Sequence, residues 1–281
     1  MPPSAPVPEQ LAARLASTLG LDPRAIRARD GREHHLFRVQ APAGTCGPED
    51  PGGERLLKVP RADGLPDPFD PTRPAADRLH AEGAVLPLVR GAGVPTPYRV
   101  FDTEPVVCAV MGVLPGTTAE IAYERGQLDE QGLAGVCLQM GRTLAAIHAV
   151  KRPDAPGIVP DLPDAAPEGR RLLHLDYHLG NVLGRPQLGG AWTITGVVDW
   201  TCARWGPVEA DLVEMQASVF CLNPRARDAF VAGYRQTSGR AVDMAEVERR
   251  AAAEIRRRLV VDRPESEELA RRWEDWVAKR A

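Results

Sequence analysis

The chain has 281 residues, 43% of them hydrophobic and 26% charged, with a formal net charge of -3 at pH 7. It is long enough to bury a core in one large domain or in two lobes, and its small net charge argues against a nucleic-acid partner. The first residues lack the basic start and apolar core of a signal peptide, and the longest strongly apolar run, 105–114, is too short to span a membrane. The five cysteines are scattered without a Cys-x-x-Cys pair, which is typical of reduced thiols in a cytoplasmic protein.

Apolar residues at helical and at alternating spacing predict a small α+β region in the first half of the chain. The expected elements are a helix at 9–19, strands at 25–29, 34–39 and 55–60, a helix at 75–89, and a hairpin formed by 98–102 and 105–113. Pro87 is expected to kink or shorten the second helix, because proline cannot continue a helix without losing a hydrogen bond.

A charged residue interrupts the apolar strand predicted at 55–60. This residue, Lys58, is expected to need a partner, because a lysine is seldom buried without one. Glu82 is the only glutamate of the helix that follows, so we expect the two side chains to pair. The alternatives are a lysine that extends to solvent at a strand edge and a glutamate on a solvated helix face.

The second half is predicted to be mainly helical around one central hairpin. The expected helices span 117–125, 129–150, 207–220, 225–237 and 243–259, and the expected hairpin strands span 181–183 and 192–198. The connection between these strands is rich in glycine and carries a proline, which is typical of a turn. Pro207 suits the first turn of its helix, where a backbone N–H has no partner within the helix.

Three polar residues stand out in the apolar surroundings of this hairpin: Asp176, Asn181 and Asp199. The hairpin would bring Asn181 and Asp199 to neighbouring strand ends, where amide and carboxylate oxygens suit a hard cation such as Mg²⁺. Asp176 lies five residues before Asn181 and is a candidate to accept a proton from a hydroxyl nucleophile. A base, an amide ligand, a hairpin and a carboxylate ligand follow one another in this order in kinase catalytic cores.

Two other interpretations of this stretch remain open. Aspartate and asparagine are common in turns and at strand ends, so Asp176, Asn181 and Asp199 would then have no chemical role. Alternatively, His174, Asp176 and His178 form a zinc site, since residues two apart share one face of a strand and these side chains are usual zinc ligands. The zinc interpretation leaves Asn181 and Asp199 unexplained.

The pattern His174-x-Asp176-x4-Asn181, followed by Val-Val-Asp199-Trp200, resembles the signature of the aminoglycoside phosphotransferase family, small-molecule kinases with a protein-kinase-like fold. Gly206-Pro207 and the following Asp-Leu pair also resemble the family's Gly-Asp-Pro…Asp-Leu pattern, although the Asp between Gly and Pro is missing here. The resemblance implies an α+β, two-lobed protein-kinase-like fold. A small β-rich N-lobe, 1–112, would bind the nucleotide, and a mainly helical C-lobe, 113–281, would carry the catalytic and acceptor-binding residues.

The resemblance also implies roles for the residues of the C-lobe. Asp176 would be the catalytic base, and Asn181 and Asp199 would hold Mg²⁺. His174 would position the loop without binding a metal, and Asp211 would be a structural residue tied to that loop.

For the N-lobe, the resemblance implies nucleotide contacts. Lys58, braced by Glu82, would hold the α- and β-phosphates of ATP or GTP. Met111 would form a wall of the adenine pocket, the Gly112 carbonyl would accept a hydrogen bond from the adenine amino group, and the Leu114 N–H would donate one to the ring.

The function implied is an ATP- or GTP-dependent O-phosphotransferase that moves the γ-phosphate to a hydroxyl of a small molecule, with an aminoglycoside or related antibiotic as the favoured acceptor and antibiotic resistance as the outcome. Carboxylates such as Glu209 and Glu214 would suit a cationic acceptor.

No Ala-Pro-Glu motif and no long activation segment follow Asp199, which favours a small substrate over a protein. The alternatives are a kinase of an amino alcohol or sugar, a nucleotide-binding pseudokinase regulator, and a metal-dependent hydrolase built on His174, Asp176 and His178. A monomer is favoured, with no nucleic-acid or membrane partner.

Overall fold

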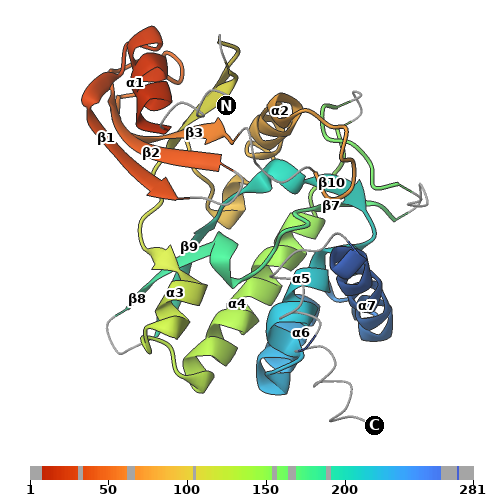
Figure 1. Cartoon of the computed structure of the whole chain (residues 1–281). Coiled ribbons are helices and arrows are strands. Elements are labelled where there is room, and N and C mark those ends of the chain that lie inside the picture. The colour runs from red at the N-terminus through yellow and green to blue at the C-terminus, as the bar shows by residue number, and fades with distance from the viewer. Residues whose placement is uncertain are drawn as a thin grey trace. The chain divides into compact units, whose positions relative to one another are not determined.

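The computed structural model of this chain describes residues 8–30, 34–61, 67–103, 106–153, 157–163, 169–187, 191–260 and 271 (Figure 1). The chain divides into two compact units, Met1–Pro87 with Pro95–Leu114, and Leu88–Val94 with Pro115–Ala281. Within the described ranges, no helix has the length and apolar character needed to cross a membrane.

The first unit is built around a five-stranded antiparallel sheet with the strand order β1-β2-β3-β5-β4. Its elements are α1 (Pro8–Thr18), β1 (Asp22–Asp30), β2 (His34–Ala41), β3 (Gly53–Pro60), α2 (Ala75–Val85), β4 (Tyr98–Phe101) and β5 (Cys108–Gly112). The helices and strands expected in this half are all present. Because α2 ends at Val85, the predicted shortening before Pro87 is confirmed.

The two faces of this sheet differ in character. Leu57 and Val59 of β3 are fully buried in an apolar cluster that includes residues of α1. Successive side chains of a strand point to opposite faces, so Lys58 lies on the other face of the sheet. The cluster also contains Leu15, Ala16, Leu21, Phe37, Val39, Ala41, Cys108 and Val110. One face therefore forms the core of the unit, while the other carries the charged residue.

The second unit combines helices with two small sheets. In chain order its elements are η1 (Arg90–Ala92), β6 (Thr117–Thr118), α3 (Ala119–Glu124), α4 (Glu130–His148), β7 (Arg171–Leu173), η2 (Leu179–Asn181), β8 (Val182–Pro186), β9 (Trp192–Val197), η3 (Trp200–Cys202), β10 (Arg204–Gly206), η4 (Val208–Leu212), α5 (Val213–Met215), η5 (Gln216–Phe220), α6 (Pro224–Ser238) and α7 (Met244–Val260). The sheets have the orders β6-β8-β9 and β10-β7. The segment Leu88–Val94 belongs to this unit, and the Val197 N–H donates to its Gly93 carbonyl at 2.8 Å.

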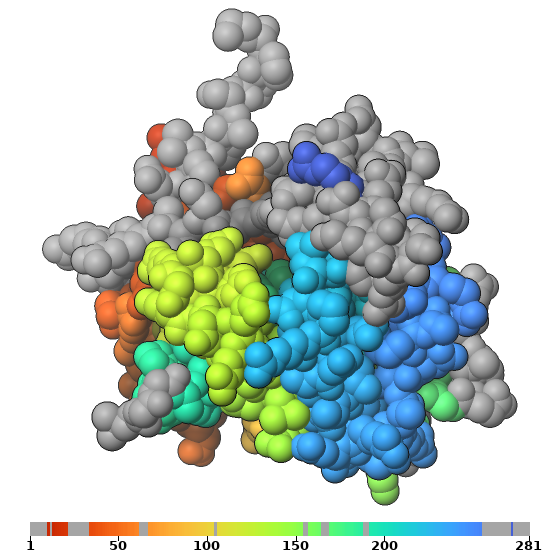
Figure 2. Space-filling view, turned by 90° about the horizontal axis from the view of Figure 1, so that it is seen from below, coloured from red at the N-terminus to blue at the C-terminus, as the bar shows by residue number. Residues whose placement is uncertain are grey.

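Helices α4 and α6 lie side by side and form the main packing contact of the second unit (Figures 1 and 2). Two glycines allow this close approach. A Cβ atom on Gly141 of α4 would lie 2.1 Å from the Phe230 carbonyl oxygen, and one on Gly233 of α6 would lie 2.1 Å from the Leu138 carbonyl oxygen. Contacts this short are impossible for real atoms, so the crossing requires glycine on both helices.

The structure differs from the sequence prediction between residues 204 and 220. The expected helix at 207–220 is a 3₁₀ turn (η4), one α-helical turn (α5) and a π-helical turn (η5) in succession. Pro207 precedes the first turn instead of lying within it. In addition, Arg204–Gly206 forms strand β10, paired with β7, where no strand was expected. The buried carboxylate of Asp211, described below, holds η4 close to the loop that follows β7, and helical periodicity does not carry this information.

Candidate active site

The loop that follows β7 carries Asp176 and has a strained backbone. Leu175 adopts a left-handed conformation with φ of 64°, which is uncommon for a residue with a branched side chain. Its N–H donates to Asp211 Oδ1, and the His174 N–H donates to Asp211 Oδ2 at 2.8 Å. The buried carboxylate therefore holds the backbone of two successive residues directly before Asp176.

Asp211 is itself held by a histidine and a tyrosine. The Nε2 atom of His148 lies 3.0 Å from Asp211 Oδ2, and its Nδ1 atom lies 2.9 Å from the Tyr234 hydroxyl. This geometry fits a neutral imidazole that donates to the carboxylate and accepts from the phenol. Burial, with the nearby charge of Asp211, raises the pKa of Tyr234 to about 12, so the phenol stays protonated and able to donate. The structural role predicted for Asp211 agrees with these contacts.

His174 also supports the loop from within. It is fully buried, its Nε2 atom lies 2.9 Å from the Val198 carbonyl oxygen, and its Nδ1 atom accepts from the Asp176 N–H at 3.3 Å. Its ring packs against Trp200, with centroids 4.5 Å apart. Both ring nitrogens are engaged in the protein, which argues against the zinc interpretation. Among the residues that the structure describes, no group of three His, Cys, Asp or Glu side chains is placed to hold a metal ion.

The predicted hairpin brings Asp176, Asn181 and the strand before Asp199 together. The Asn181 amide nitrogen donates to Asp176 Oδ2 at 2.7 Å and to the Asp176 carbonyl oxygen at 2.9 Å. The Asn181 carbonyl oxygen of the main chain accepts from the Val198 N–H at 3.0 Å, next to Asp199. Because the amide nitrogen is committed to Asp176, the side-chain oxygen of Asn181 is the atom that remains for a cation.

Asp199 lies at the end of β9 in a left-handed conformation, with φ of 63°. Aspartate tolerates this region better than most residues. The Thr201 hydroxyl donates to its Oδ1 atom at 2.8 Å. An amide oxygen and a carboxylate are suitable protein ligands for Mg²⁺, which usually keeps waters or substrate phosphates in its other positions. The donor set present here therefore fits this ion.

Two more polar side chains lie beside this loop. A Cβ atom on Gly180 would lie 2.8 Å from Glu120 Oε2 and 2.6 Å from His178 Cε1, so only glycine allows both side chains to approach. Burial lowers the pKa of His178, but a hydrogen bond with Asp176 and the charges of Asp176, Glu120 and Asp199 outweigh this effect and raise the pKa. No motif in the sequence marks Glu120.

In the first unit, the predicted pair of Lys58 and Glu82 is present. The Lys58 Nζ atom lies 2.9 Å from Glu82 Oε2, and both side chains are buried. The Tyr98 hydroxyl donates to the same oxygen at 2.9 Å, a contact that no sequence pattern indicates. The pairing of Lys58 with Ala109 and of Leu56 with Met111 in adjacent strands places Met111 on the same face of the sheet as Lys58.

The remaining two predicted nucleotide contacts lie at the end of β5. The Gly112 N–H donates to the Pro97 carbonyl oxygen at 2.7 Å, and a Cβ atom on Gly112 would lie 2.1 Å from the Thr96 carbonyl oxygen. Glycine is therefore required where the chain leaves the sheet. Leu114 follows as a half-buried residue outside the strand. The roles of Met111, Gly112 and Leu114 in nucleotide binding stay predictions.

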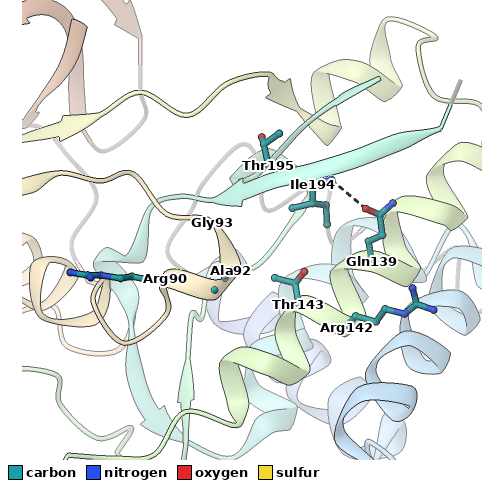
Figure 3. Close-up of a pocket in the computed structure, with 9 residues that line it drawn as sticks. Arg90, Ala92, Gly93, Gln139, Arg142, Thr143, Ile194 and Thr195 are labelled. Atoms are coloured by element: carbon teal, nitrogen blue, oxygen red, sulfur yellow. Dashed lines mark hydrogen bonds between the residues drawn. The ribbon is translucent and has the colours of Figure 1, made fainter. Parts of the chain in front are cut away.

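A cavity of about 530 Å³ lies in the second unit between η1, α4 and β9 (Figure 3). It is lined by Arg90, Gly91, Ala92, Gly93, Gln139, Arg142, Thr143, Ile194 and Thr195, so none of the predicted site residues contributes to it. The Gln139 amide nitrogen donates to the Trp192 carbonyl oxygen at 2.7 Å, and its oxygen accepts from the Ile194 N–H at 3.3 Å. Gln139 thus links α4 to β9 through hydrogen bonds with the backbone of the strand.

A model of the phosphotransferase enzyme family matches residues 25–158 and 157–253. No curated protein sequence matches the chain. Among solved structures, the GDP complex of wild-type aminoglycoside 2'-phosphotransferase-IIIa is similar, with a TM-score of 0.62 and 15% identity over 91% of this chain and 93% of that chain.

Two further similar structures are described as complexes that contain kanamycin or streptomycin. The GDP and kanamycin complex of APH(2")-IIia has a TM-score of 0.59 and 15% identity, over 91% of this chain and 90% of that chain. The streptomycin-ATP-APH(2")-IIa ternary complex has a TM-score of 0.54 and 10% identity, over 98% of this chain and 97% of that chain. These likenesses show a shared kinase-like fold, and the family model covers most of the chain. The chain therefore belongs to the phosphotransferase enzyme family and is a phosphotransferase that acts on hydroxyl groups.

Proposed function

We propose that this protein transfers the γ-phosphate of ATP or GTP to a hydroxyl group of an aminoglycoside or a related cationic antibiotic. The observation that carries the proposal is the contact between Asn181 and Asp176. The Asn181 amide donates to the Asp176 carboxylate at 2.7 Å. This hydrogen bond holds the candidate base and the candidate metal ligand next to each other. The Val198 N–H donates to the Asn181 carbonyl oxygen, which places the next residue, Asp199, at the same end of the hairpin.

In the proposed reaction, Asp176 orients the acceptor hydroxyl and takes its proton as the oxygen attacks the γ-phosphorus. The new oxygen–phosphorus bond forms while the bond to the β-phosphate oxygen breaks, so that ADP or GDP leaves. Asn181 and Asp199 would hold Mg²⁺, which when bound neutralises charge on the β- and γ-phosphates. The contribution of the protein is mainly positioning and electrostatic stabilisation.

The first unit supplies the proposed nucleotide contacts. Lys58 is held at 2.9 Å from Glu82 and is a fixed positive charge for the α- and β-phosphates. Met111 lies on the same sheet face as a wall for the base, and the backbone of Gly112 and Leu114 would form hydrogen bonds with it. We assign nucleotide binding to residues 1–112, together with the adjoining Leu114 N–H, and catalysis and acceptor binding to residues 113–281.

Two observations support a cationic acceptor. Glu120 is an exposed carboxylate close to Gly180 and His178, so an ammonium group of an acceptor bound at the catalytic loop would be attracted to it. In addition, two similar structures are described as complexes with kanamycin and with streptomycin. A small-molecule kinase of an amino alcohol or sugar is the second candidate, since the same loop would serve either acceptor.

The test is nucleotide turnover with Mg²⁺ against a panel of aminoglycosides, other antibiotics, amino alcohols and sugars. We expect acceptor-dependent release of ADP or GDP that falls about 100- to 10,000-fold in Asp176→Asn, the usual contribution of a general base. Nucleotide affinity should stay within a few-fold of the original. Asp228→Asn is the matched control, since Asp228 is an exposed carboxylate of α6, and this variant should keep full activity.

Three outcomes would count against the proposal. Turnover only with amino alcohols or sugars would replace the antibiotic acceptor. Nucleotide binding without turnover on any acceptor would favour a pseudokinase regulator. Unchanged turnover in Asp176→Asn would remove Asp176 as the base.

A further inference from the structure

A tyrosine outside the predicted site contacts the buried ion pair of the first unit. The Tyr98 hydroxyl lies 2.9 Å from Glu82 Oε2, the same oxygen that accepts from Lys58 Nζ at 2.9 Å. The same hydroxyl also lies 3.2 Å from the Leu79 carbonyl oxygen of α2. Three elements, β3, α2 and β4, therefore meet at one carboxylate oxygen.

The burial of this group makes its hydrogen bonds important. Glu82 and Lys58 have relative exposures of 0% and 2%. Moving a carboxylate out of water is costly unless its charge is paired and its oxygens accept hydrogen bonds. The Tyr98 hydroxyl donates a charge-assisted hydrogen bond, which is stronger than a hydrogen bond between two neutral groups. Glu82 thus has a second donor that comes from the sheet and does not depend on Lys58.

The ring of Tyr98 is also fitted to the helix. A Cβ atom on Gly83 would lie 3.2 Å from Tyr98 Cε1, closer than nearly all real contacts of this kind. Gly83 therefore leaves room for the ring against α2, directly after Glu82. Tyr98 lies on β4, the edge strand of the sheet, and pairs with Met111 of β5, the strand between β4 and β3. The contact fixes the distance and rotation of α2 relative to β3.

We infer that Tyr98 is a positioning residue that holds Glu82, and through it Lys58, in the geometry that binds the nucleotide phosphates. This inference rests on the proposed function. In kinase-type sites the Lys–Glu ion pair must be in place for phosphoryl transfer, and the position of the helix that carries the glutamate controls it. Tyr98 keeps α2 in the paired position without touching the nucleotide.

The experiment is a double-mutant cycle with Tyr98→Phe, Glu82→Gln and the double variant. Phenylalanine keeps the ring against Gly83 and removes only the hydroxyl. We expect Tyr98→Phe to lower kcat/KM for the Mg²⁺-nucleotide about 10- to 100-fold, the size expected for a hydrogen bond to a charged group, with an unchanged KM for the acceptor. In the Glu82→Gln background the same substitution should change kcat/KM less than about two-fold, because the partner carboxylate is gone.

Tyr123→Phe is the matched control, since Tyr123 is an exposed tyrosine of α3, with 41% relative exposure. It should leave all constants unchanged. A merely structural Tyr98 would lower the urea midpoint of unfolding and leave kcat/KM for the nucleotide unchanged. That result, or an equal loss of kcat/KM in both backgrounds, would overturn the inference.

One further variant separates this inference from the proposed function. Lys58→Met should weaken binding of a fluorescent ATP or GTP analogue at least ten-fold if Lys58 holds the phosphates. If Lys58→Met binds the analogue normally, the phosphate assignment of the proposed function is wrong, and with it the role of Tyr98. If Lys58→Met loses binding and Tyr98→Phe does not change kcat/KM, only the inference about Tyr98 is wrong.

Discussion

The two units of this protein hold their charged site residues in different ways. In the first unit, side chains hold one another: Glu82 accepts from Lys58 and from Tyr98, and all three come from separate elements. In the second unit, the side chain of Asp211 accepts hydrogen bonds from the backbone N–H groups of His174 and Leu175. The backbone held in this way determines the position of Asp176, the next residue. The first arrangement fixes a charge, whereas the second fixes the conformation of a loop.

This difference fits the tasks that we propose for the two units. A phosphate group is bound by a positive charge that must stay ionised in a buried position, so a paired carboxylate is the suitable support. A catalytic base must lie at a defined point beside the acceptor hydroxyl, which depends on backbone geometry. The left-handed conformation of Leu175 costs about 1 kcal/mol or more, and residues of this kind persist only where the surroundings hold them.

The largest effect on stability is expected from breaking the support of the loop with Asp211→Asn. An amide would direct its N–H group at backbone N–H donors or at His148, so at least one buried donor would lose its acceptor. We expect the free energy of unfolding to fall by about 3 kcal/mol and kcat by about 100-fold, the usual cost of a small displacement in an active site.

Urea unfolding and steady-state kinetics measure these two effects. Asp228→Asn on the exposed face of α6 is the control. If Asp211→Asn unfolds like the original protein and keeps its kcat, the loop does not depend on this carboxylate.

A second ion pair of the first unit, between Asp50 and Arg55, should make the stability of the protein depend on pH. Burial raises the pKa of Asp50, but hydrogen bonds from the Cys46 N–H, the Arg55 side chain and the Gly52 N–H, with the charge of Arg55, outweigh this effect and lower the pKa below its usual 3.8. Asp50 therefore binds fewer protons in the folded than in the unfolded protein. Its contribution to stability is complete above about pH 4 and is lost as the pH falls through the lowered value.

We expect Asp50→Asn to be about 2 kcal/mol less stable than the original protein at pH 7, because a buried charge-assisted hydrogen bond is weakened. The difference should shrink as the pH is lowered from 4. Urea unfolding at a series of pH values from 3 to 7 measures it. A difference that stays constant over this range would mean that Asp50 does not titrate with a lowered pKa.

The smallest effect is expected at Gln139, which attaches the hairpin to α4. Gln139→Leu keeps a similar volume but leaves the Trp192 carbonyl and the Ile194 N–H without this partner. We expect a loss of about 1 kcal/mol in unfolding free energy and less than about a three-fold change in kcat, since Asp211 and His174 still hold the loop. Gln127→Leu at an exposed position is the control. A kcat loss as large as that of Asp211→Asn would show that β9, rather than the loop, limits the position of the site.

Much of the site could be predicted from local patterns. The hairpin around Asn181 follows from apolar strands separated by a Gly-rich connection, and the partner of Lys58 follows from the scarcity of acidic residues in the next helix. The predicted helix at 207–220 was incomplete, because a buried contact of Asp211 decides the geometry of η4 and helical spacing does not report such contacts. Tyr98 and Glu120 carried no signal, since a tyrosine in a strand and a glutamate on a short helix are ordinary in any sequence.

By itself, the sequence determined most of the helices and strands, the family and the residues available for chemistry, because periodicity, turn composition and motif spacing are local properties. Only the tertiary structure decided which donors reach each carboxylate. Glu82 receives Tyr98 from β4, and Asp211 receives His148 from α4 and the backbone of His174 and Leu175. These partners are separated by 16, 63, 37 and 36 residues along the chain. Hydrogen bonds over such separations depend on how helices and strands pack, which no local pattern encodes.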